Sequence, residues 1–313
     1  MASACCEVAG RHARSVATRS ARNIPARRQT GTARHRCELP VPGGPNAILW
    51  DAAVTGGEPR TDARQVLGLL SRGEMAIEGR LPWSSNATFL VAVRPPARRS
   101  GSAGAASPPG RDEDAGAPML AIYKPSTGER PLWDFPRGLW KREVAAYELD
   151  AYLGWGLVPP TVARPDGPLG GGSLQYCVDA SLEEHYFTLL DKPSHHDDLR
   201  RVAAFDLVTN NADRKGGHYL LDRDGHIWAI DHGLCFHVDP KLRTVCWDFA
   251  GLPVPRALLA DLVPLSRGKV PPALHKLLSS EEIGALAART GDVCAHGRYP
   301  EPKTDYPYPW PLL

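Results

Sequence analysis

The sequence predicts an α+β fold of two lobes, a small antiparallel β lobe with one key helix and a mainly helical large lobe. Three observations favour this arrangement. In the first half, strand-length apolar runs separated by turn residues surround a single long helical pattern. Helical patterns predominate in the second half. In the second half, a polar loop also leads into a short hairpin with an Asp-Gly turn.

We expect three regions along the 313 residues. Residues 1–45 form a basic arm, with eight arginines between positions 11 and 36, and contain too few apolar residues to fold alone. Residues 46–178 form the small lobe, interrupted at 94–118 by a Pro-, Ala-, Ser- and Gly-rich insert typical of a flexible loop. Residues 179–313 form the large lobe and end in an extended Pro- and Tyr-rich tail.

Charge and cysteine content disfavour several classes of protein. A net charge of +2 does not require a nucleic-acid partner. The seven cysteines form no C-x-x-C pair, which disfavours a zinc site, and their odd number suits free thiols in a reducing cytoplasm. No apolar run has the length of a membrane span, and the arm lacks the apolar core of a secretory signal. We therefore expect a cytoplasmic protein without a transmembrane segment, of open oligomeric state.

The small lobe is expected to begin with a helix at 62–73, which Asp62 can cap and Gly73 can end. Strands follow at 75–78, 87–93 and 119–125. A helix at 140–153 carries one apolar stripe.

Two further strands, 157–162 and 174–178, complete this lobe, and the second leads into the connection between the lobes. The large lobe is expected to hold three helices, at about 197–207, at 255–263, and from the capping box Ser279-x-x-Glu282 toward Gly291.

The most informative stretch runs from Phe205 to Phe236. Its polar loop, residues 210–218, contains a glycine pair and carries Asp213. An apolar run, an Asp-Gly turn and a returning strand then deliver Asp231, 18 residues further on (231 − 213 = 18). Phosphoryl transfer from ATP uses two such carboxylates, because one orients the attacking hydroxyl and the other holds the magnesium that bridges the phosphates.

This stretch resembles the phosphatidylinositol 3- and 4-kinase-like branch of the atypical kinases, and is most similar to uncharacterised bacterial members of that branch. The branch has a catalytic loop D-R-x-x-x-N followed by a D-x-G triplet. Here the loop is Asp213 to His218 and the triplet is Asp231-His232-Gly233. His218 stands where the branch has Asn, and imidazole is a poorer magnesium ligand than an amide oxygen. The resemblance implies a bilobal kinase-like fold and an ATP- and Mg²⁺-dependent phosphotransferase, with Mn²⁺ as a possible substitute.

The same resemblance implies roles within the loop and the triplet. Asp213 is expected to orient or deprotonate the acceptor hydroxyl, and Asp231 to bind the metal, with His218 in the second-metal position. Arg214 and Lys215 are expected to contact the γ-phosphate or an acidic acceptor.

In the small lobe, Lys124 and Glu143 are 19 residues apart (143 − 124 = 19) and match the kinase lysine that contacts the α- and β-phosphates and its glutamate partner. The loop between the first two strands is expected to cover the phosphates through Ser84, Ser85 and Asn86. The strand at 174–178 is expected to offer backbone groups of Gln175 and Cys177 to adenine.

Two alternatives remain open. A pseudokinase or nucleotide-binding scaffold, suggested by His218, would bind ATP without transferring phosphate. A metal-dependent phosphohydrolase would use the His-rich segments at 183–185 and 195–198, although a helix start explains the second segment equally well. The hydroxyl acceptor, whether lipid, protein or small molecule, is unresolved, because Lys241-Leu242-Arg243 is too small a cluster to predict membrane binding.

Overall fold

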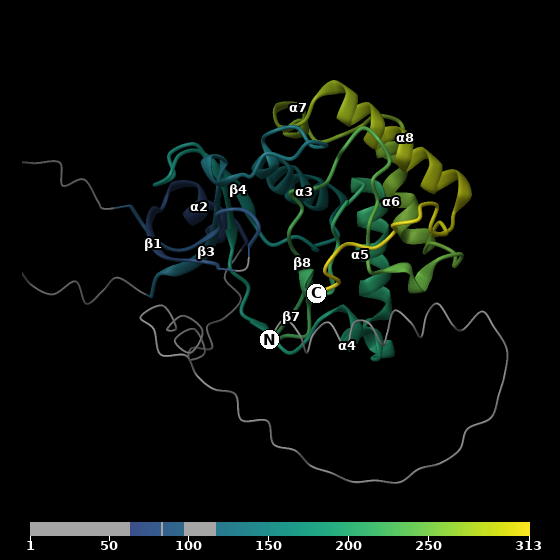
Figure 1. The fold of residues 1–313 in the computed structure, drawn as a ribbon, viewed down its shortest axis with the longest axis horizontal. Coiled ribbons are helices and arrows are strands. Elements are labelled where there is room, and N and C mark those ends of the chain that lie inside the picture. Colours follow the sequence, from purple (N-terminus) through teal and green to yellow (C-terminus); the bar gives the residue numbers. More distant parts are fainter. Residues whose placement is uncertain (1–62, 83, 97–116) are drawn as a thin grey trace, which may run out of the picture. The chain divides into compact units, whose positions relative to one another are not determined.

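The computed structural model describes residues 63–82, 84–96 and 117–313 (Figure 1). The expected basic arm at 1–45 lies outside these residues, as does the insert at 94–118 except for its first three and last two positions. The described part combines an antiparallel five-stranded sheet, a three-stranded sheet and several helices. It has the predicted α+β class, and its element order is consistent with a bilobal kinase-like fold.

The larger sheet has the strand order β1-β2-β3-β5-β4 with every neighbouring pair antiparallel. Its strands are β1 (Glu74–Arg80), β2 (Phe89–Arg94), β3 (Met119–Pro125), β4 (Thr161–Arg164) and β5 (Gly172–Tyr176). Helix α2 (Ala63–Arg72) packs Val66 and Leu70 against buried side chains of the sheet, among them Val91 and Tyr123. Within the sheet, β3 lies between β2 and β5.

Helix α3 (Leu139–Leu153) is preceded by Gly138 (φ 93°) and followed by Gly154 (φ 69°), both with left-handed backbone. A left-handed glycine such as Gly154 is common where a helix ends. The expected strand start at Leu157 is wrong, because the amides of Leu157 and Val158 donate to the Asp150 carboxylate at 2.8 and 2.9 Å. This connection is therefore a loop tied to α3, and β4 begins only at Thr161.

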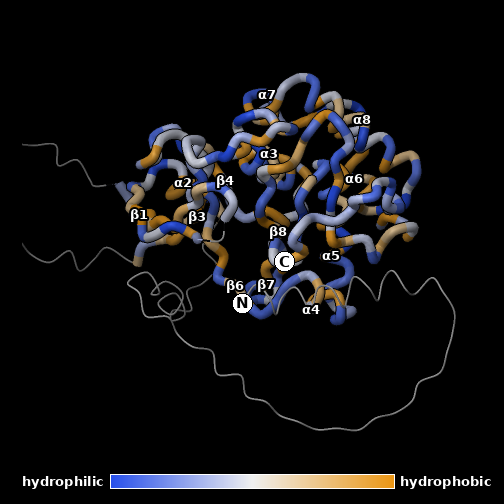
Figure 2. Tube along the Cα trace, viewed as in Figure 1, coloured by the Kyte–Doolittle hydropathy of each residue, from blue (hydrophilic) through white to orange (hydrophobic). Residues whose placement is uncertain are grey.

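The rest of the chain forms the helical part and a small sheet ordered β6-β7-β8. The strands are β6 (Ala180–Ser181), β7 (Tyr219–Asp222) and β8 (Ile227–Ala229), and β7 and β8 form the predicted hairpin. The helices are α4 (Tyr186–Leu190), α5 (His196–Thr209), α6 (Arg256–Ser266), α7 (Leu274–Leu277) and α8 (Ser280–His296). Their buried apolar side chains form one continuous core, and Figure 2 shows hydrophobic residues recurring along α3, α6 and β8.

Helix α8 begins with the predicted capping box, in which Ser279 and Glu282 exchange side-chain and backbone hydrogen bonds. It does not end near Gly291 as expected. Thr290 is buried and Val293 packs against the core, so continued packing outweighs the low helix propensity of one glycine. The helix ends at Gly297, whose φ of 63° is left-handed.

No helix in the described ranges is both long and apolar enough to cross a membrane.

Candidate active site

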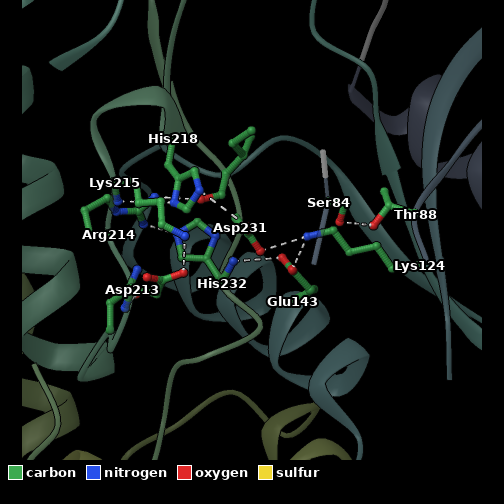
Figure 3. A network of polar contacts seen from close by, with 12 residues as sticks. Ser84, Thr88, Lys124, Glu143, Asp213, Arg214, Lys215, His218, Asp231 and His232 are labelled. Atoms are coloured by element: carbon green, nitrogen blue, oxygen red, sulfur yellow. Dashed lines mark hydrogen bonds and ion pairs between the residues drawn. The ribbon is translucent and has the colours of Figure 1, made fainter. Parts of the chain in front are cut away.

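Lys124 stands near the end of β3, where its side chain meets two carboxylates (Figure 3). Its Nζ donates to Oε1 of Glu143 on α3 and to Oδ1 of Asp231, the latter at 3.1 Å. Burial opposes the charge on Lys124, but the charges of Asp231 and Glu143 prevail and raise its pKa. The structure thus brings together three predicted site residues, of which Lys124 and Asp231 are 107 positions apart in the sequence.

Glu143 is buried, with 3% of its surface exposed, and uses both oxygens. One contacts Lys124, and the other accepts the backbone N–H of His232 at 2.9 Å. A Cβ at Gly233 would lie 3.3 Å from Oε1 of Glu143, which favours glycine at this position. Glu143 therefore positions both the lysine and the backbone of the D-x-G triplet.

Asp231 follows β8 with a φ of 61°, a left-handed conformation that is uncommon for a residue with a side chain. Its side chain is half exposed, at 49%. Desolvation works to raise the pKa of Asp231, but Lys124 and the neighbouring positive side chains prevail and lower it. An ionised, accessible carboxylate results, and magnesium is commonly held by one or two carboxylates together with the phosphates of its substrate.

His218 ends a short 3₁₀ turn, Gly216–His218, and its ring lies beside Asp231. Nδ1 accepts the backbone N–H of Lys215 at 3.3 Å, so the proton of the neutral ring resides on Nε2, which faces Oδ2 of Asp231 at 3.4 Å. Burial lowers the pKa of His218 to about 3, which keeps the ring neutral near pH 7. In this arrangement Nε2 lies beside the Asp231 carboxylate rather than open to an ion, and the role of His218 as a metal ligand stays a prediction.

A cluster of three or more His, Cys, Asp or Glu side chains suited to a metal ion is absent from residues 63–82, 84–96 and 117–313. The Asp231 carboxylate therefore fits a metal ion that is also bound by nucleotide phosphates better than an ion that is held by protein side chains alone.

Asp213 and Lys215 lie on the loop before that turn. Nζ of Lys215 donates to Oδ2 of Asp213 at 2.7 Å, and the amide of Asp213 donates to the side chain of Asn211 at 3.0 Å. Partial burial raises the pKa of Asp213, and Lys215 opposes that rise. A carboxylate with a raised pKa is a better proton acceptor, as a base in hydroxyl activation needs to be.

Arg214 does not have the expected position. It is fully buried, and its guanidinium donates to both oxygens of Asp206 on α5 at 2.9–3.1 Å. The remaining contacts are to the carbonyl of Ile230 at 2.6 Å and to Nε2 of His232 at 2.8 Å. With no exposed surface, Arg214 cannot contact a phosphate or an acceptor here, and it instead links α5, the loop and the D-x-G triplet.

The parts of this network played by Asp206 and His232 were not predicted from the sequence. One available signal was the position of Asp206 within the apolar run of α5, since a buried carboxylate requires a partner.

The predicted phosphate-covering loop joins β1 and β2. Oγ of Ser84 and Oγ1 of Thr88 lie 2.8 Å apart, and Ser85 is exposed. The side-chain carbonyl of Asn86 accepts the backbone N–H of Arg130 at 2.9 Å, which ties the loop to the segment after β3. Figure 3 draws Ser84 and Lys124 in the same close-up.

The predicted adenine contacts are largely occupied within the larger sheet. The amide side chain of Gln175 is buried and donates to Oγ1 of Thr161 at 2.8 Å. The backbone N–H of Cys177 donates to the carbonyl of Leu120 at 3.1 Å. The Cys177 amide is therefore used within the sheet, and the contact of this strand's backbone with adenine stays a prediction.

The histidines behind the hydrolase alternative have local structural partners. Nδ1 of His185 accepts the amide of Thr188 at 3.4 Å and caps α4. Nε2 of His196 hydrogen-bonds the carbonyl of Leu190 at 2.8 Å. One ring nitrogen of each histidine is therefore engaged locally, and the second segment forms the start of α5, as its alternative explanation expects.

Sequence comparison finds a relative over most of the chain. Protein Rv2133c of Mycobacterium tuberculosis strain H37Rv is 38% identical over 283 residues, which cover 78% of this chain and 94% of that protein. No protein-family profile matches the chain.

Two solved structures are similar at low sequence identity. The structure of hydra Fam20 with sugar is 13% identical, covers 76% of this chain and 90% of its own, and has a TM-score of 0.43. The Helicobacter pylori proinflammatory kinase CtkA is 13% identical, with coverages of 71% and 92% and a TM-score of 0.36. At these TM-scores the two likenesses decide nothing about the function of this chain.

Proposed function

The chain belongs to the family of the mycobacterial protein Rv2133c, and we propose that it is an ATP-dependent phosphotransferase, a kinase that acts on a hydroxyl acceptor. The observation that carries this proposal is the contact of Lys124 with Glu143 and Asp231. The buried carboxylate of Glu143 holds the Lys124 ammonium beside the accessible, ionised carboxylate of Asp231. Binding of nucleotide phosphates requires such a cation, and binding of their metal requires such a carboxylate.

Each residue of this group has a distinct task in the proposed reaction. Lys124 neutralises charge on the α- and β-phosphates, and Glu143 keeps its ammonium in place. Asp231 would hold Mg²⁺ or Mn²⁺, which when bound neutralises the charge of the transferring phosphoryl group. The ring of His218, whose Nε2 lies 3.4 Å from Oδ2 of Asp231, restricts the orientation of that carboxylate.

Asp213 acts on the acceptor. Its carboxylate accepts the hydrogen bond of the attacking hydroxyl and can take the proton as the new O–P bond forms, which its raised pKa favours. The bond between the γ-phosphorus and the bridging oxygen breaks at the same time, and ADP leaves with that oxygen. Lys215 donates to this carboxylate, and we expect it also to contact the γ-phosphate or an anionic acceptor.

We further assign the chain to the phosphatidylinositol 3- and 4-kinase-like superfamily, on the strength of the Asp213-Arg214 loop and the Asp231-His232-Gly233 triplet. A second candidate, a nucleotide-binding pseudokinase, is favoured by one observation. Nε2 of His218 carries its proton toward Asp231, at the place where the superfamily has a second metal ligand. The pseudokinase would bind metal–ATP and release no ADP.

The test is a thermal-shift titration of the full chain with ATP, with and without Mg²⁺ or Mn²⁺, alongside ADP release. Saturating metal–ATP should stabilise the protein by about 3 kcal/mol at a concentration 100-fold above Kd. Asp231→Ala should abolish the metal-dependent part of the shift, and Asp213→Asn should retain the shift and lose ADP release.

Asp197→Asn serves as the matched control, because that carboxylate is 85% exposed on α5 and makes only a surface ion pair with Arg200. No shift with any metal at millimolar ATP would refute the proposal. A shift without ADP release would establish the pseudokinase instead.

A further inference from the structure

The polypeptide after α8 returns to the catalytic loop. We call residues 299–312 the tail segment. Its first residue, Tyr299, is buried, donates its hydroxyl to the carbonyl of Arg200 at 2.7 Å, and exchanges backbone hydrogen bonds with Gly251 and Leu252. This attachment belongs to the core of the helical part, since Tyr299 also packs against Phe249.

The tail segment has a second attachment after an exposed stretch. Residues 301–306 are all exposed, whereas Pro309 is buried. The carbonyl of Pro307 accepts the amide of Thr244 at 3.1 Å and the indole N–H of Trp247 at 3.0 Å. The carbonyl of Leu312 accepts the amide of Gly216 at 2.7 Å.

The carbonyls of Pro307 and Leu312 accept hydrogen bonds from two segments that adjoin the proposed catalytic residues. Gly216 is the first residue of the 3₁₀ turn that ends at His218, whose carbonyl in turn accepts the amide of Ile230, next to Asp231. Thr244 forms a parallel bridge with Arg214, the residue after Asp213, and the amide of Val245 donates to the Arg214 carbonyl at 3.1 Å.

We infer that the tail segment positions the catalytic loop, and that the Leu312–Gly216 hydrogen bond fixes the turn that aims His218 at Asp231. The inference rests on the proposed phosphotransferase function. It predicts that loosening the second attachment slows phosphoryl transfer while nucleotide binding, which depends on Lys124 and Glu143, is retained.

The second attachment can open without unfolding the protein. It consists of three hydrogen bonds, the buried Pro309 and the packing of Leu312 against the core. An exposed stretch leads to it, and regions of that kind open at a fraction of the global free energy. The first attachment at Tyr299 would keep the segment tethered.

Gly216→Pro is the most selective perturbation. Proline lacks the N–H that Leu312 accepts, and its fixed φ suits the first position of a helical turn. The preceding Lys215 already has φ −92° and ψ 163°, which a residue before proline adopts readily. Trp247→Phe keeps an aromatic ring and removes the indole donor to Pro307. Tyr306→Ala is the control, because that side chain is 82% exposed and every backbone acceptor stays.

With the full chain, we expect Gly216→Pro to lower ADP release at saturating ATP at least tenfold, with KM for ATP changed less than threefold. Trp247→Phe should lower ADP release by a smaller factor, and ADP release by Tyr306→Ala should stay within twofold of the wild type. Tyr306→Ala should keep the wild-type urea midpoint, whereas Gly216→Pro and Trp247→Phe, which each lose a hydrogen bond, should lower it slightly. A fall in turnover that only parallels a lower urea midpoint, or wild-type turnover in Gly216→Pro, would overturn the inference.

A deletion of residues 307–313 removes both acceptor carbonyls, those of Pro307 and Leu312, and keeps the Tyr299 attachment. Amide hydrogen exchange should accelerate in peptides covering 214–218 and 243–247, and remain unchanged in α6 and α8. Unchanged exchange at 214–218 would overturn the inference even if the wild type binds and turns over ATP. Because exchange needs no nucleotide, this measurement also separates failure of the positioning role from failure of the proposed function.

Discussion

The Arg214–Asp206 pair allows a quantitative test of the interior of the site. Both side chains are essentially inaccessible, at 0% and 1% exposure, and Asp206 also accepts the side-chain amide of Asn211 at 3.1 Å. The substitution Asp206→Asn keeps the shape of the side chain and removes its charge. It leaves the guanidinium buried without a charged partner. Its neutral partners are the carbonyl of Ile230, Nε2 of His232, the Tyr219 ring at 5.7 Å and the amide oxygen of the substituted side chain.

Removing one partner of a buried ion pair costs about 3–5 kcal/mol, because the remaining charge stays desolvated. These neutral contacts of Arg214 survive, so we expect the lower end of that range, about 3 kcal/mol. The free energy of unfolding should be measured in urea for the wild type, Asp206→Asn, Arg214→Met and the double variant. Arg214→Met together with Asp206→Asn should destabilise the protein by at least about 2 kcal/mol less than the sum of the two single variants.

An Asp206→Asn cost below about 1 kcal/mol would refute the assignment of Arg214 as a buried structural cation. So would an Arg214→Met variant that unfolds like the wild type and has lost only phosphate transfer, since that result would restore the predicted contact between Arg214 and the γ-phosphate.

Two further predictions concern α3. Glu143→Gln leaves Lys124 with Asp231 as its one charged partner among the described residues. Binding of metal–ATP, measured by thermal-shift titration, should weaken about tenfold, which corresponds to about 1.4 kcal/mol. An unchanged affinity would contradict the role given to Glu143. Burial raises the pKa of Asp150 from 3.8 to about 6, so the folded state binds the proton more tightly than the unfolded state, and the stabilisation present below pH 4 is lost as the pH rises to 6. This group should lower the free energy of unfolding by about 3 kcal/mol over that range, and the difference between the wild type and Asp150→Asn, measured at several pH values, should show it; parallel pH curves would contradict the assignment.

The sequence was sufficient for the α+β class and for most of the elements around the site. Strand β3, the β7–β8 hairpin and the start of α8 depend on signals carried by neighbouring residues, namely apolar alternation, an Asp-Gly turn and a capping box. The spacing of Lys124 and Glu143 on one strand and one helix was also readable, and the structure joins their side chains.

Other features were decided only by tertiary packing. The sequence shows that Arg214 is charged, but the direction of its side chain depends on the buried carboxylate of Asp206 on another element. Gly291 resembles a helix stop, yet α8 continues because its next turn packs on the core. The contacts of the tail segment with Gly216 and Thr244 use backbone carbonyls, which every residue possesses and no sequence pattern distinguishes. Local patterns thus determined which elements form, whereas long-range burial and hydrogen bonding determined which groups face the site.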